Sequence, residues 1–460
     1  MDLATATRRL AAHGQQSVLR FWGSLDDGGR ARLLAQVESL DLDWLERVFA
    51  AEWRAVDPRH IAPPGDVVRE GHGQERDAIS LGEEALRLGR VGTLLVAGGQ
   101  GTRLGFDGPK GEFPVGAVSG RTLYRIHGER LLALGRRCGR TPPLYLMTSD
   151  ANHEAALELF AREACFGLPP DRVRIFQQGL APAVDDSGTL LLDAPDHVAM
   201  APNGNGGLFA ALRDSGAFEH MRSIGVDTIS YIQVDNPLSL SCDPRFVGHH
   251  LLRQSQFSCK AIRKTSPFER VGSYARVNGR LQVVEYTEIP AELAQRIDDQ
   301  GELLLSFSNP GLFVWSREFA EAQAARRDLP FHKAHKKIPH LDAGGQLLFP
   351  AEPSGYKFEA FAMDTLPDAE RSLLLACDRD AEFAPVKNAA GDDSPASARA
   401  LMTKLYTSWI VRAGGRMVSP GAAIEVSPLY ALDAEELQAK LPRGFEVTSD
   451  LYLGPGPRQT

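Results

Sequence analysis

A short apolar run that leads directly into a glycine-rich turn is the feature that most constrains how this chain can fold. Residues 93–97 read TLLVA, and residues 98–105 follow as GGQGTRLG. A continuous apolar run of this length is typical of a parallel strand buried on both faces. Glycines after such a strand let backbone N–H groups approach phosphate oxygens, because no Cβ stands in the way. The segment therefore predicts an α/β fold with an anion-binding turn at a strand end.

Similar apolar runs recur along the middle of the chain, at 144–147 (LYLM), 173–176 (VRIF) and 228–234 (TISYIQV). Between them lie segments with helical character, at 122–134, 153–160 and 207–212. Because strand and helix alternate, we expect a largely parallel sheet flanked by helices. Residues 274–286 alternate around an Asn-Gly pair, a strong hairpin signal, so the sheet is expected to carry an antiparallel excursion.

The two ends of the chain differ from this middle part. Between residues 10 and 49 apolar side chains recur every three or four positions, which predicts amphipathic helices. The Pro- and Gly-bearing stretch 57–74 breaks this pattern and indicates a connector or wrapped loop. Residues 388–399 (NAAGDDSPASAR) are small and polar, as in a surface connector. We therefore expect a helical N-terminal region (1–90), a catalytic domain (91–387) and a small C-terminal domain (388–460).

Composition narrows the class of protein. The chain has 51 Lys and Arg against 59 Asp and Glu, a formal net charge of −8, which argues against a protein that coats nucleic acid. No apolar run approaches the roughly 20 residues that span a bilayer, and the first residues have no secretory apolar region. Five widely spaced cysteines form no metal-binding pair and are expected to stay reduced. A cytoplasmic protein that binds neither membrane nor nucleic acid is expected.

The turn at 98–105 does not follow either common phosphate-loop pattern. The dinucleotide fingerprint fails because its third glycine would fall on Leu104, and the Walker loop fails because Lys110 follows Pro109. Arg103 offers a planar fork suited to phosphates, and Lys110 a point charge from a Pro-preceded loop. The alternative is a tight turn with a solvated Arg and Lys. The length of the motif, with its Pro-Lys-Gly ending, favours phosphate binding.

Residues 94–116 (LLVAGGQGTRLGFDGPKGEFPVG) resemble the signature of nucleotide-sugar pyrophosphorylases, and within them the UDP-N-acetylglucosamine pyrophosphorylase group of eukaryotic type. Further segments resemble motifs of that group in the same order: 176–178 (FQQ) with 182–183 (PA), 200–207 (MAPNGNGG), 234–236 (VDN), 283–289 (VVEYTEI), 336–339 (KKIP), 355–359 (GYKFE), 384–388 (APVKN) and 424–429 (IEVSPL). The resemblance implies a Rossmann-like nucleotidyltransferase fold, similar to the GT-A type, with a mixed, mostly parallel sheet.

The activity that the resemblance implies is attack of a sugar 1-phosphate on the α-phosphorus of UTP, which yields a UDP-sugar and pyrophosphate. Such transfer needs in-line positioning of two anions and positive charge around the reacting phosphates. The resemblance places the triphosphate on the glycine-rich turn and the reacting phosphates near further cations. The residues so implied are Gly98, Gly99, Gly101, Thr102 and Arg103 in the turn, then Lys110, Lys357 and Lys387.

A Mg²⁺ ion is also expected, because a divalent cation screens the approach of one phosphate to another. Asp235, at the end of the apolar run 228–234, matches the family position and is the candidate anchor. The alternative for Asp235 is a helix-capping or turn residue. The basic run 332–340 (HKAHKKIPH) could face phosphate, but charge runs are usually solvated, and surface is the preferred interpretation.

The uracil and sugar positions rest on the resemblance alone. It places uracil on Gln178 and Gly204, and the sugar on five residues: Asn205, Gly272, Glu285, Tyr286 and Asn309. Two positions depart from the family pattern, since Asn203 stands where Asp is usual and 306–309 reads SFSN in place of NAGN. These changes leave open whether the sugar is N-acetylglucosamine, glucose, galactose or N-acetylgalactosamine.

Three functions compete. The first is a uridylyltransferase that makes UDP-N-acetylglucosamine or, as a variant, UDP-glucose or several UDP-sugars. The second is a non-catalytic module that binds UDP-sugars, since fold does not fix function. The third is a scaffold whose N-terminal helices recruit a partner protein. Retention of Arg103, Lys110, Asp235, Lys357 and Lys387 favours the enzyme.

Overall fold

The computed structural model describes residues 1–51, 56–71, 73–326 and 329–455. The chain forms two compact units. One contains residues 1–55, 178–208 and 326–365, and the other contains residues 56–177, 209–325 and 366–460. No helix within the described ranges has both the length and the apolar character that crossing a membrane requires.

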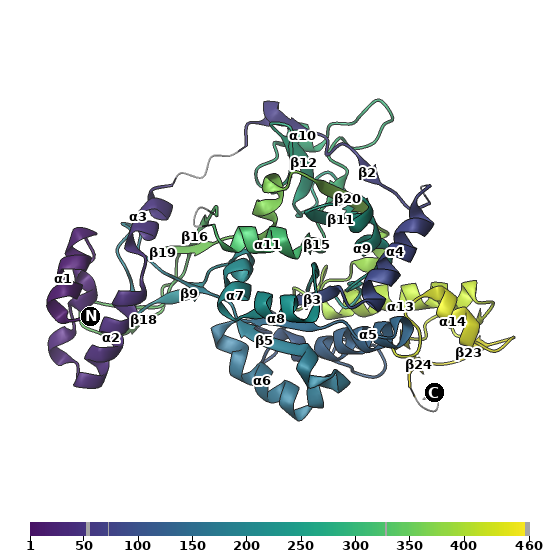
Figure 1. The fold of residues 1–460 in the computed structure, drawn as a ribbon, viewed down its shortest axis with the longest axis horizontal. Helices are drawn as coiled ribbons and strands as arrows, with labels where there is room; N and C mark the ends of the chain where they lie inside the picture. The colour runs from purple at the N-terminus through teal and green to yellow at the C-terminus, as the bar shows by residue number, and fades with distance from the viewer. Residues whose placement is uncertain (52–55, 72, 327–328, 456–460) are drawn as a thin grey trace. The chain divides into compact units, whose positions relative to one another are not determined.

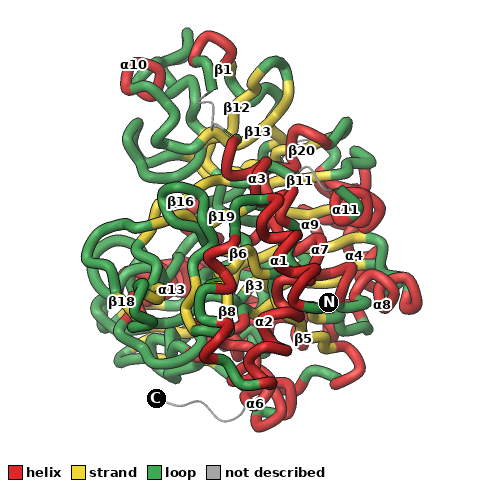
Figure 2. Tube along the Cα trace, turned by 90° about the vertical axis from the view of Figure 1, so that its left-hand side faces the viewer, coloured by secondary structure: helices red, strands yellow, loops and turns green. Residues whose placement is uncertain are grey.

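The smaller unit begins with the helices α1 (Leu3–Ala12), α2 (Asp27–Ser39) and α3 (Leu42–Ala50). Each starts at an aspartate whose side chain accepts a hydrogen bond from a backbone N–H three residues on, a common N-cap. Figure 2 shows α1 and α2 side by side, and their apolar faces share a core that includes Leu10, Leu33 and Val37. The amphipathic helices expected between residues 10 and 49 are confirmed.

Short antiparallel strand pairs complete this unit. They are β6 (Leu180–Pro182) with β9 (Met200–Pro202), β7 (Leu192–Ala194) with β8 (His197–Val198), β16 (His332–Lys336) with β19 (Gly355–Glu359), and β17 (His340–Leu341) with β18 (Leu347–Leu348). The basic run 332–340 thus begins as a strand. Its side chains range from half-buried to exposed apart from the buried Ile338, so the expectation of a surface segment is largely confirmed.

A mixed sheet organises the larger unit (Figure 1). Its parallel part has the spatial order β10 (Thr228–Gln233), β3 (Val91–Val96), β4 (Leu144–Thr148) and β5 (Val173–Gln177). β15 (Phe313–Ser316) lies antiparallel between β10 and β11 (Phe257–Arg263). The other strands are β1 (Ile61–Ala62), β2 (Val67–Val68), β12 (Ser273–Val277), β13 (Arg280–Val284), β14 (Phe307–Ser308) and β20 (Ser372–Ala376).

Helices cover both faces of this sheet. The helices α4 (Glu75–Arg87), α5 (Leu123–Cys138) and α9 (Pro244–Leu252) pack their apolar residues on one face. The other face meets α7 (Leu208–Asp214), α8 (Ala217–Ile224) and α11 (Arg317–Ala324), with aromatic contacts from Phe209 to Trp315 and from Phe257 to Phe319. α4 and α9 pack so closely that a Cβ on Gly82 would lie 1.9 Å from a backbone oxygen of Pro244. The expected α/β fold with a mixed, mostly parallel sheet is confirmed.

The predicted hairpin at 274–286 is confirmed, because β12 pairs antiparallel with β13 around Asn278, which has φ +50°. Two other expectations need correction. The stretch 57–74 is not only a connector, since β1 pairs with β12 and β2 with β20. Both strands have two residues, too few for a periodic pattern.

The interpretation of 388–399 as a connector is wrong for residues 395–399, which begin helix α13 (Pro395–Arg412). Ser394 caps that helix, and Pro395 occupies its first turn. The remaining C-terminal elements are α14 (Ala434–Lys440), β21 (Arg416–Met417) paired with β23 (Glu446–Val447), and β22 (Ile424–Val426) paired with β24 (Leu451–Leu453). Two short helices, α10 (Ala291–Ala294) and α12 (Arg379–Glu382), precede them. The three-part domain division stays a prediction.

Two buried histidines predict how stability depends on pH. Burial lowers the pKa of His127 on α5, helped by the neighbouring Arg130, and burial alone lowers that of His250 on α9; both fall from 6.5 to about 3. As the pH falls below 6.5 the unfolded chain binds protons that the folded chain refuses. The free energy of unfolding should therefore drop by about 1.4 kcal/mol per pH unit for each histidine, down to a pH near the folded pKa.

Urea unfolding of His250→Gln between pH 4 and 6 should show a slope shallower by about 1.4 kcal/mol per pH unit. The matched control is His60→Gln, which removes an exposed histidine and should keep the slope of the unchanged protein. Equal slopes for all three proteins would contradict the assignment of a neutral, buried His250.

Candidate functional site

The glycine-rich turn after β3 closes on itself through backbone hydrogen bonds. Gly101 N–H donates to the carbonyl of Gly108 (2.9 Å), and Lys110 N–H donates to that of Gly99 (3.1 Å). The side chain of Asn152 braces the turn from outside, donating to the carbonyls of Ala97 (2.9 Å) and Gly99 (3.3 Å). The turn is therefore a fixed loop that brings the backbone of Gly99 against Lys110.

Two glycines of this turn, Gly99 and Gly101, differ in whether packing leaves room for a side chain. A Cβ on Gly101 would lie 2.7 Å from the ring of Phe106, so packing within the turn requires that glycine. A Cβ on Gly99 would meet only Lys110 Cε, at 3.7 Å, and the φ of Gly99 is one that other residues adopt. Packing alone thus leaves Gly99 unexplained, whereas a ligand that approaches the backbone would explain it.

The cations of the turn occupy two environments. Thr102 and Arg103, in a short 3₁₀ turn (Thr102–Leu104), are exposed, and no ion pair joins Arg103 to another described side chain. Lys110 is mostly buried, and its Nζ lies 3.4 Å from Oδ2 of Asp235. Arg103 can therefore reach a ligand without losing a protein partner, whereas Lys110 is already held at the strand edge.

Lys110 and Asp235 meet at the position where an α/β sheet usually binds ligands. The chain runs from β3 to β4 and β5 on one side and returns to β10 on the other side of β3. The carboxyl ends of β3 and β10 therefore flank the point where strand order reverses, the usual crevice of such sheets. Asp235 lies two residues after the end of β10, and the Lys110 loop follows β3.

Two side chains of helix α5 form hydrogen bonds to the backbone around Asp235. The ring of His127 bonds through Nε2 to the carbonyl of Val234 (3.1 Å), and Arg130 donates from Nη1 to the carbonyl of Pro237 (3.2 Å) and to that of Ser239. All the donors are buried side chains. The backbone on both sides of Asp235 is thus fixed, so its carboxylate has little freedom to shift.

A distant segment is bound to the same strand end. Val386 N–H donates to the carbonyl of Asp235 (2.9 Å), and the side chain of Asn236 bonds to Ala384 N–H (3.0 Å) and to the carbonyl of Glu382 (2.7 Å). Lys387 follows Val386 in the chain; its side chain is half-exposed, and its Nζ lies 3.8 Å from Oδ2 of Asp393. The structure therefore places the backbone of Lys387 beside Asp235, a proximity that spacing along the chain does not reveal.

Three of the residues expected on the sugar side lie together. Asn309 N–H donates to the carbonyl of Gly272 (2.9 Å), and the Tyr274 hydroxyl lies 3.0 Å from Oδ1 of Asn309. A Cβ on Gly272 would lie 3.1 Å from Oε1 of Glu285 and 2.5 Å from Val283. Gly272, Glu285 and Asn309 thus form one cluster. Tyr286 follows Glu285, and 43% of its surface is exposed.

The remaining candidates belong to the smaller unit. Gln178 donates from Nε2 to the carbonyl of Gly204 (2.6 Å), and Oδ1 of Asn205 accepts from Ala362 N–H (2.9 Å). Gly204 has φ +82°, and a Cβ there would lie 2.2 Å from the carbonyl oxygen of Ala360. Gly204 and Asn205 therefore belong to a second glycine-rich turn, and Gln178 bonds to it. Lys357 lies in β19, in register with Ala334 of β16.

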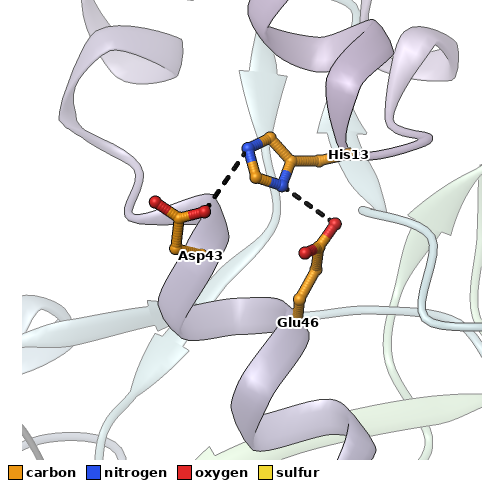
Figure 3. A group of neighbouring side chains, drawn as sticks. All are labelled: His13, Asp43 and Glu46. Atoms are coloured by element: carbon orange, nitrogen blue, oxygen red, sulfur yellow. Dashed lines mark hydrogen bonds and ion pairs between the residues drawn. The ribbon is translucent and has the colours of Figure 1, made fainter.

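Among the described residues, one group of three His, Asp or Glu side chains has the chemistry and spacing to hold a metal, and it lies far along the chain from the turns above. It consists of His13, Asp43 and Glu46 (Figure 3). Glu46 approaches Nδ1 of the ring (2.9 Å), whereas Asp43 approaches Nε2 (3.8 Å). Since the two carboxylates face opposite ring nitrogens, the arrangement is better explained as ion pairs that tie α1 to α3.

Sequence reasoning missed the residues that hold the site in place. His127, Arg130, Asn152 and Glu382 belong to no recognisable motif, and only the fold brings them to the strand ends. One signal was readable: a single lysine, Lys260, interrupts the apolar run 257–262 (FSCKAI). A charge inside a buried strand needs partners, and here the partners are Asp243 and Glu382.

Comparison with known proteins gives a consistent result. Residues 47–446 match the sequence profile of the family described as UTP–glucose-1-phosphate uridylyltransferase. The chain is 35% identical over 463 residues to UDP-N-acetylglucosamine diphosphorylase 2 of Arabidopsis thaliana, covering 94% of this chain and 90% of that protein. It is 36% identical over 490 residues to the human UDP-N-acetylhexosamine pyrophosphorylase-like protein 1, covering 97% and 96%.

The fold is similar to that of solved enzymes. The crystal structure of the uridine diphosphate N-acetylglucosamine pyrophosphorylase from Trypanosoma brucei superposes with a TM-score of 0.82 at 27% identity, covering 97% of this chain and 98% of that one. The pyrophosphorylase structure from Entamoeba histolytica gives a TM-score of 0.79 at 29% identity, covering 86% of this chain and 100% of that one.

Gly99 provides a test of whether the turn binds phosphate. Gly99→Ala should leave the free energy of unfolding within about 0.5 kcal/mol, because the new methyl group meets no close neighbour. It should raise the Kd for UTP about tenfold, since it separates the backbone donors from a charged ligand. Isothermal titration calorimetry measures the affinity, and urea unfolding the stability.

The matched control is Gly421→Ala, where a Cβ would have no atom within 4 Å and φ is again ordinary. This control should change neither stability nor affinity. If Gly99→Ala bound UTP as tightly as the control does, the turn would not be in contact with phosphate.

Proposed function

We propose, from the premise that this chain belongs to the UTP–glucose-1-phosphate uridylyltransferase family, that it makes UDP-N-acetylglucosamine and pyrophosphate from UTP and N-acetylglucosamine 1-phosphate. The chain is a nucleotidyltransferase that forms a UDP-sugar. The observation that carries the proposal is the meeting of Lys110 and Asp235 at the strand-order reversal, beside a glycine turn open to a ligand.

The reaction places two anions in contact. An oxygen of the sugar 1-phosphate attacks the α-phosphorus of UTP, the bond from that phosphorus to the bridging oxygen breaks, and pyrophosphate leaves with the electron pair. The protein lowers the barrier by alignment and by fixed positive charge. We assign the triphosphate to the backbone of Gly98, Gly99, Gly101 and Thr102 and to Arg103. Lys110, Lys357 and Lys387 act on the reacting phosphates.

Several features support these roles. Backbone donors of a closed turn need no reorganisation when an anion arrives. Lys110 is held by a long contact to one carboxylate, so its remaining N–H groups can turn to phosphate oxygens. Lys387 is half-exposed and fixed through its neighbour Val386 to the same strand end. Lys357 keeps its role from the resemblance of 355–359 to the family motif.

Asp235 fits a Mg²⁺ ion. Mg²⁺ in nucleotide enzymes commonly takes one or two protein carboxylates, with phosphate oxygens and water supplying the other ligands. The Asp235 side chain lies at the carboxyl end of β10, where the strand order reverses, and is 14% exposed. Its only partner among the described side chains is Lys110, at 3.4 Å. When bound, the ion neutralises charge on the phosphates. Asp235 would hold it, and the His127 and Arg130 contacts keep Asp235 in place.

The base and sugar are assigned from the resemblance with support from the local structure. Gln178 and Gly204 form the uracil side, where their mutual hydrogen bond fixes a backbone edge. The amide of Asn205, with Gly272, Glu285, Tyr286 and Asn309, contacts the sugar. The clustering of Gly272, Glu285 and Asn309 supports this assignment. Because Ser306 to Asn309 departs from the family pattern, UDP-glucose and other UDP-sugars are the alternative products to test.

The non-catalytic alternative is less well supported. A module that only binds UDP-sugars has no need of the carboxylate and the several cations that we assign to the metal and the reacting phosphates. The free thiols of the five cysteines also agree with a reducing compartment, and we place the enzyme in the cytoplasm.

Pyrophosphate release from UTP, measured with a panel of sugar 1-phosphates, tests the function. N-acetylglucosamine 1-phosphate should give the highest kcat/KM, above N-acetylgalactosamine, glucose and galactose 1-phosphates. The rate should fall to background with EDTA and recover with Mg²⁺. Release with a different preferred sugar would correct the product but keep the reaction class. No release with any sugar, combined with intact binding of UDP-sugar, would support the non-catalytic module.

A further inference from the structure

A buried charge cluster lies beside the segment that carries Lys387. The side chain of Lys260, in β11, is fully buried. Its ammonium lies 2.7 Å from the carboxylate of Asp243 and also contacts the carboxylate of Glu382. The ring of Phe246 lies 5.5 Å from the ammonium on a further side. No residue of this cluster is among those assigned above to substrate or metal.

Lys260 carries a positive charge in this cluster. Burial lowers the pKa of Lys260, but the carboxylates of Asp243 and Glu382 outweigh burial, so that the pKa is raised and the ammonium stays charged. Asp243 is itself fixed, because its other oxygen caps α9 by accepting from Arg245 N–H (3.0 Å). Lys260 thus joins two elements, α9 and α12, to the sheet.

The cluster is connected to the reacting end of the molecule through Glu382. The same residue that binds Lys260 through its carboxylate accepts, through its backbone carbonyl, the side-chain N–H of Asn236 (2.7 Å). Asn236 is the residue after Asp235, and its other side-chain atom receives Ala384 N–H (3.0 Å). From there Val386 N–H reaches the carbonyl of Asp235 (2.9 Å). A continuous chain of bonds therefore runs from Lys260 to Asp235 and Lys387.

Burying three charged side chains costs free energy, so stability alone does not explain the cluster. Buried ions lose hydration, and well-packed apolar residues of similar volume often give equal or greater stability. The neighbours of Lys260 in β11, Cys259 and Ala261, are buried and small. An apolar residue in place of Lys260 would suit this strand, but it could not fix the end of α12 by a directed contact.

We propose that Lys260 is a positioning residue for catalysis, which sets the register of residues 382–387 against the strand end and thereby places Asp235 and Lys387. This inference rests on the proposed function, since it takes the roles of Asp235 and Lys387 from there. It adds that their placement depends on one buried ammonium, through Glu382 and Asn236. A shift of about 1 Å at reacting groups can lower turnover about 100-fold.

The test uses the full-length enzyme with Lys260→Met, which keeps length and volume but removes the charge. We expect kcat to fall about 100-fold while the KM for UTP stays within about threefold, because the glycine turn is untouched. We also expect weaker Mn²⁺ binding to the UTP complex, measured by proton relaxation, which does not depend on turnover. The matched control is Lys440→Met, which breaks a pair with Glu436 within α14 and should change none of these quantities.

A second variant separates positioning from simple charge balance. Lys260→Met combined with Glu382→Gln removes one of the two carboxylates that lose the ammonium, so the melting temperature should rise towards that of the unchanged enzyme. Turnover and Mn²⁺ affinity should stay low, because the directed contact is still missing. If both recovered together with stability, or if Lys260→Met kept full kcat, the positioning role would be overturned.

Glu382→Gln alone covers the case in which Lys260→Met does not fold, since it keeps the Lys260–Asp243 pair. It should lower kcat several-fold at an unchanged melting temperature, and unchanged kcat would overturn the role.

Asp235→Asn in the same assay distinguishes the two proposals. If Asp235→Asn is inactive while the variants of the cluster are fully active, only the positioning role fails. If Asp235→Asn is fully active, the function assigned to that carboxylate fails.

Discussion

The contact between Lys110 and Asp235 is the constraint on which the rest of the site depends. The 3.4 Å approach of the two side chains requires β3 and β10 to be parallel neighbours in register, with Val91 opposite Thr228. It also requires the turn after β3 to fold back, which the bond from Lys110 N–H to Gly99 provides. A sheet of another strand order would separate the two charges, because strand ends meet only at a shared edge.

Fixed opposite charges at a strand end need a rigid support, and the support here is a set of buried polar side chains. His127 and Arg130 hold the backbone around Asp235 from α5, and Asn236 holds the segment before Lys387. His127, Arg130 and Asn236 each bond to a backbone carbonyl, which limits the cost of burying these side chains. The site thus gains precision from groups that never touch the substrate.

Much of the fold could be predicted from the sequence because parallel strands buried on both faces leave continuous apolar runs. The runs at 93–97, 144–147, 173–176 and 228–234 all became strands within a residue or two of the predicted ends. The glycine turn was readable for the same reason, since it follows such a run directly. The two-residue strands β1 and β2 were not, because their pairing with β12 and β20 leaves no local pattern.

The sequence predicted some residues of the candidate site but not the contacts between them. Gly272, Glu285 and Asn309 were expected on one side from the resemblance, and the structure brings them together. The proximity of Lys387 to Asp235 depends on backbone bonds between segments about 150 residues apart, and no local pattern encodes such bonds. Lys260 was visible as a charge in an apolar run, but its partners were not. Local patterns therefore predict which residues are unusual, and the topology decides which of them meet.

A double-mutant cycle on kcat tests most directly whether Lys110 and Asp235 act together on the same phosphates. The cycle compares Lys110→Met, Asp235→Asn and the double variant in pyrophosphate release, with UTP binding measured for each. If the two side chains act as one unit, each single change should lower kcat far more than it weakens UTP binding. The kcat of the double variant should then be little below that of the less active single variant. Losses that multiply in the double variant would show independent actions and would contradict a shared site at the strand-order reversal.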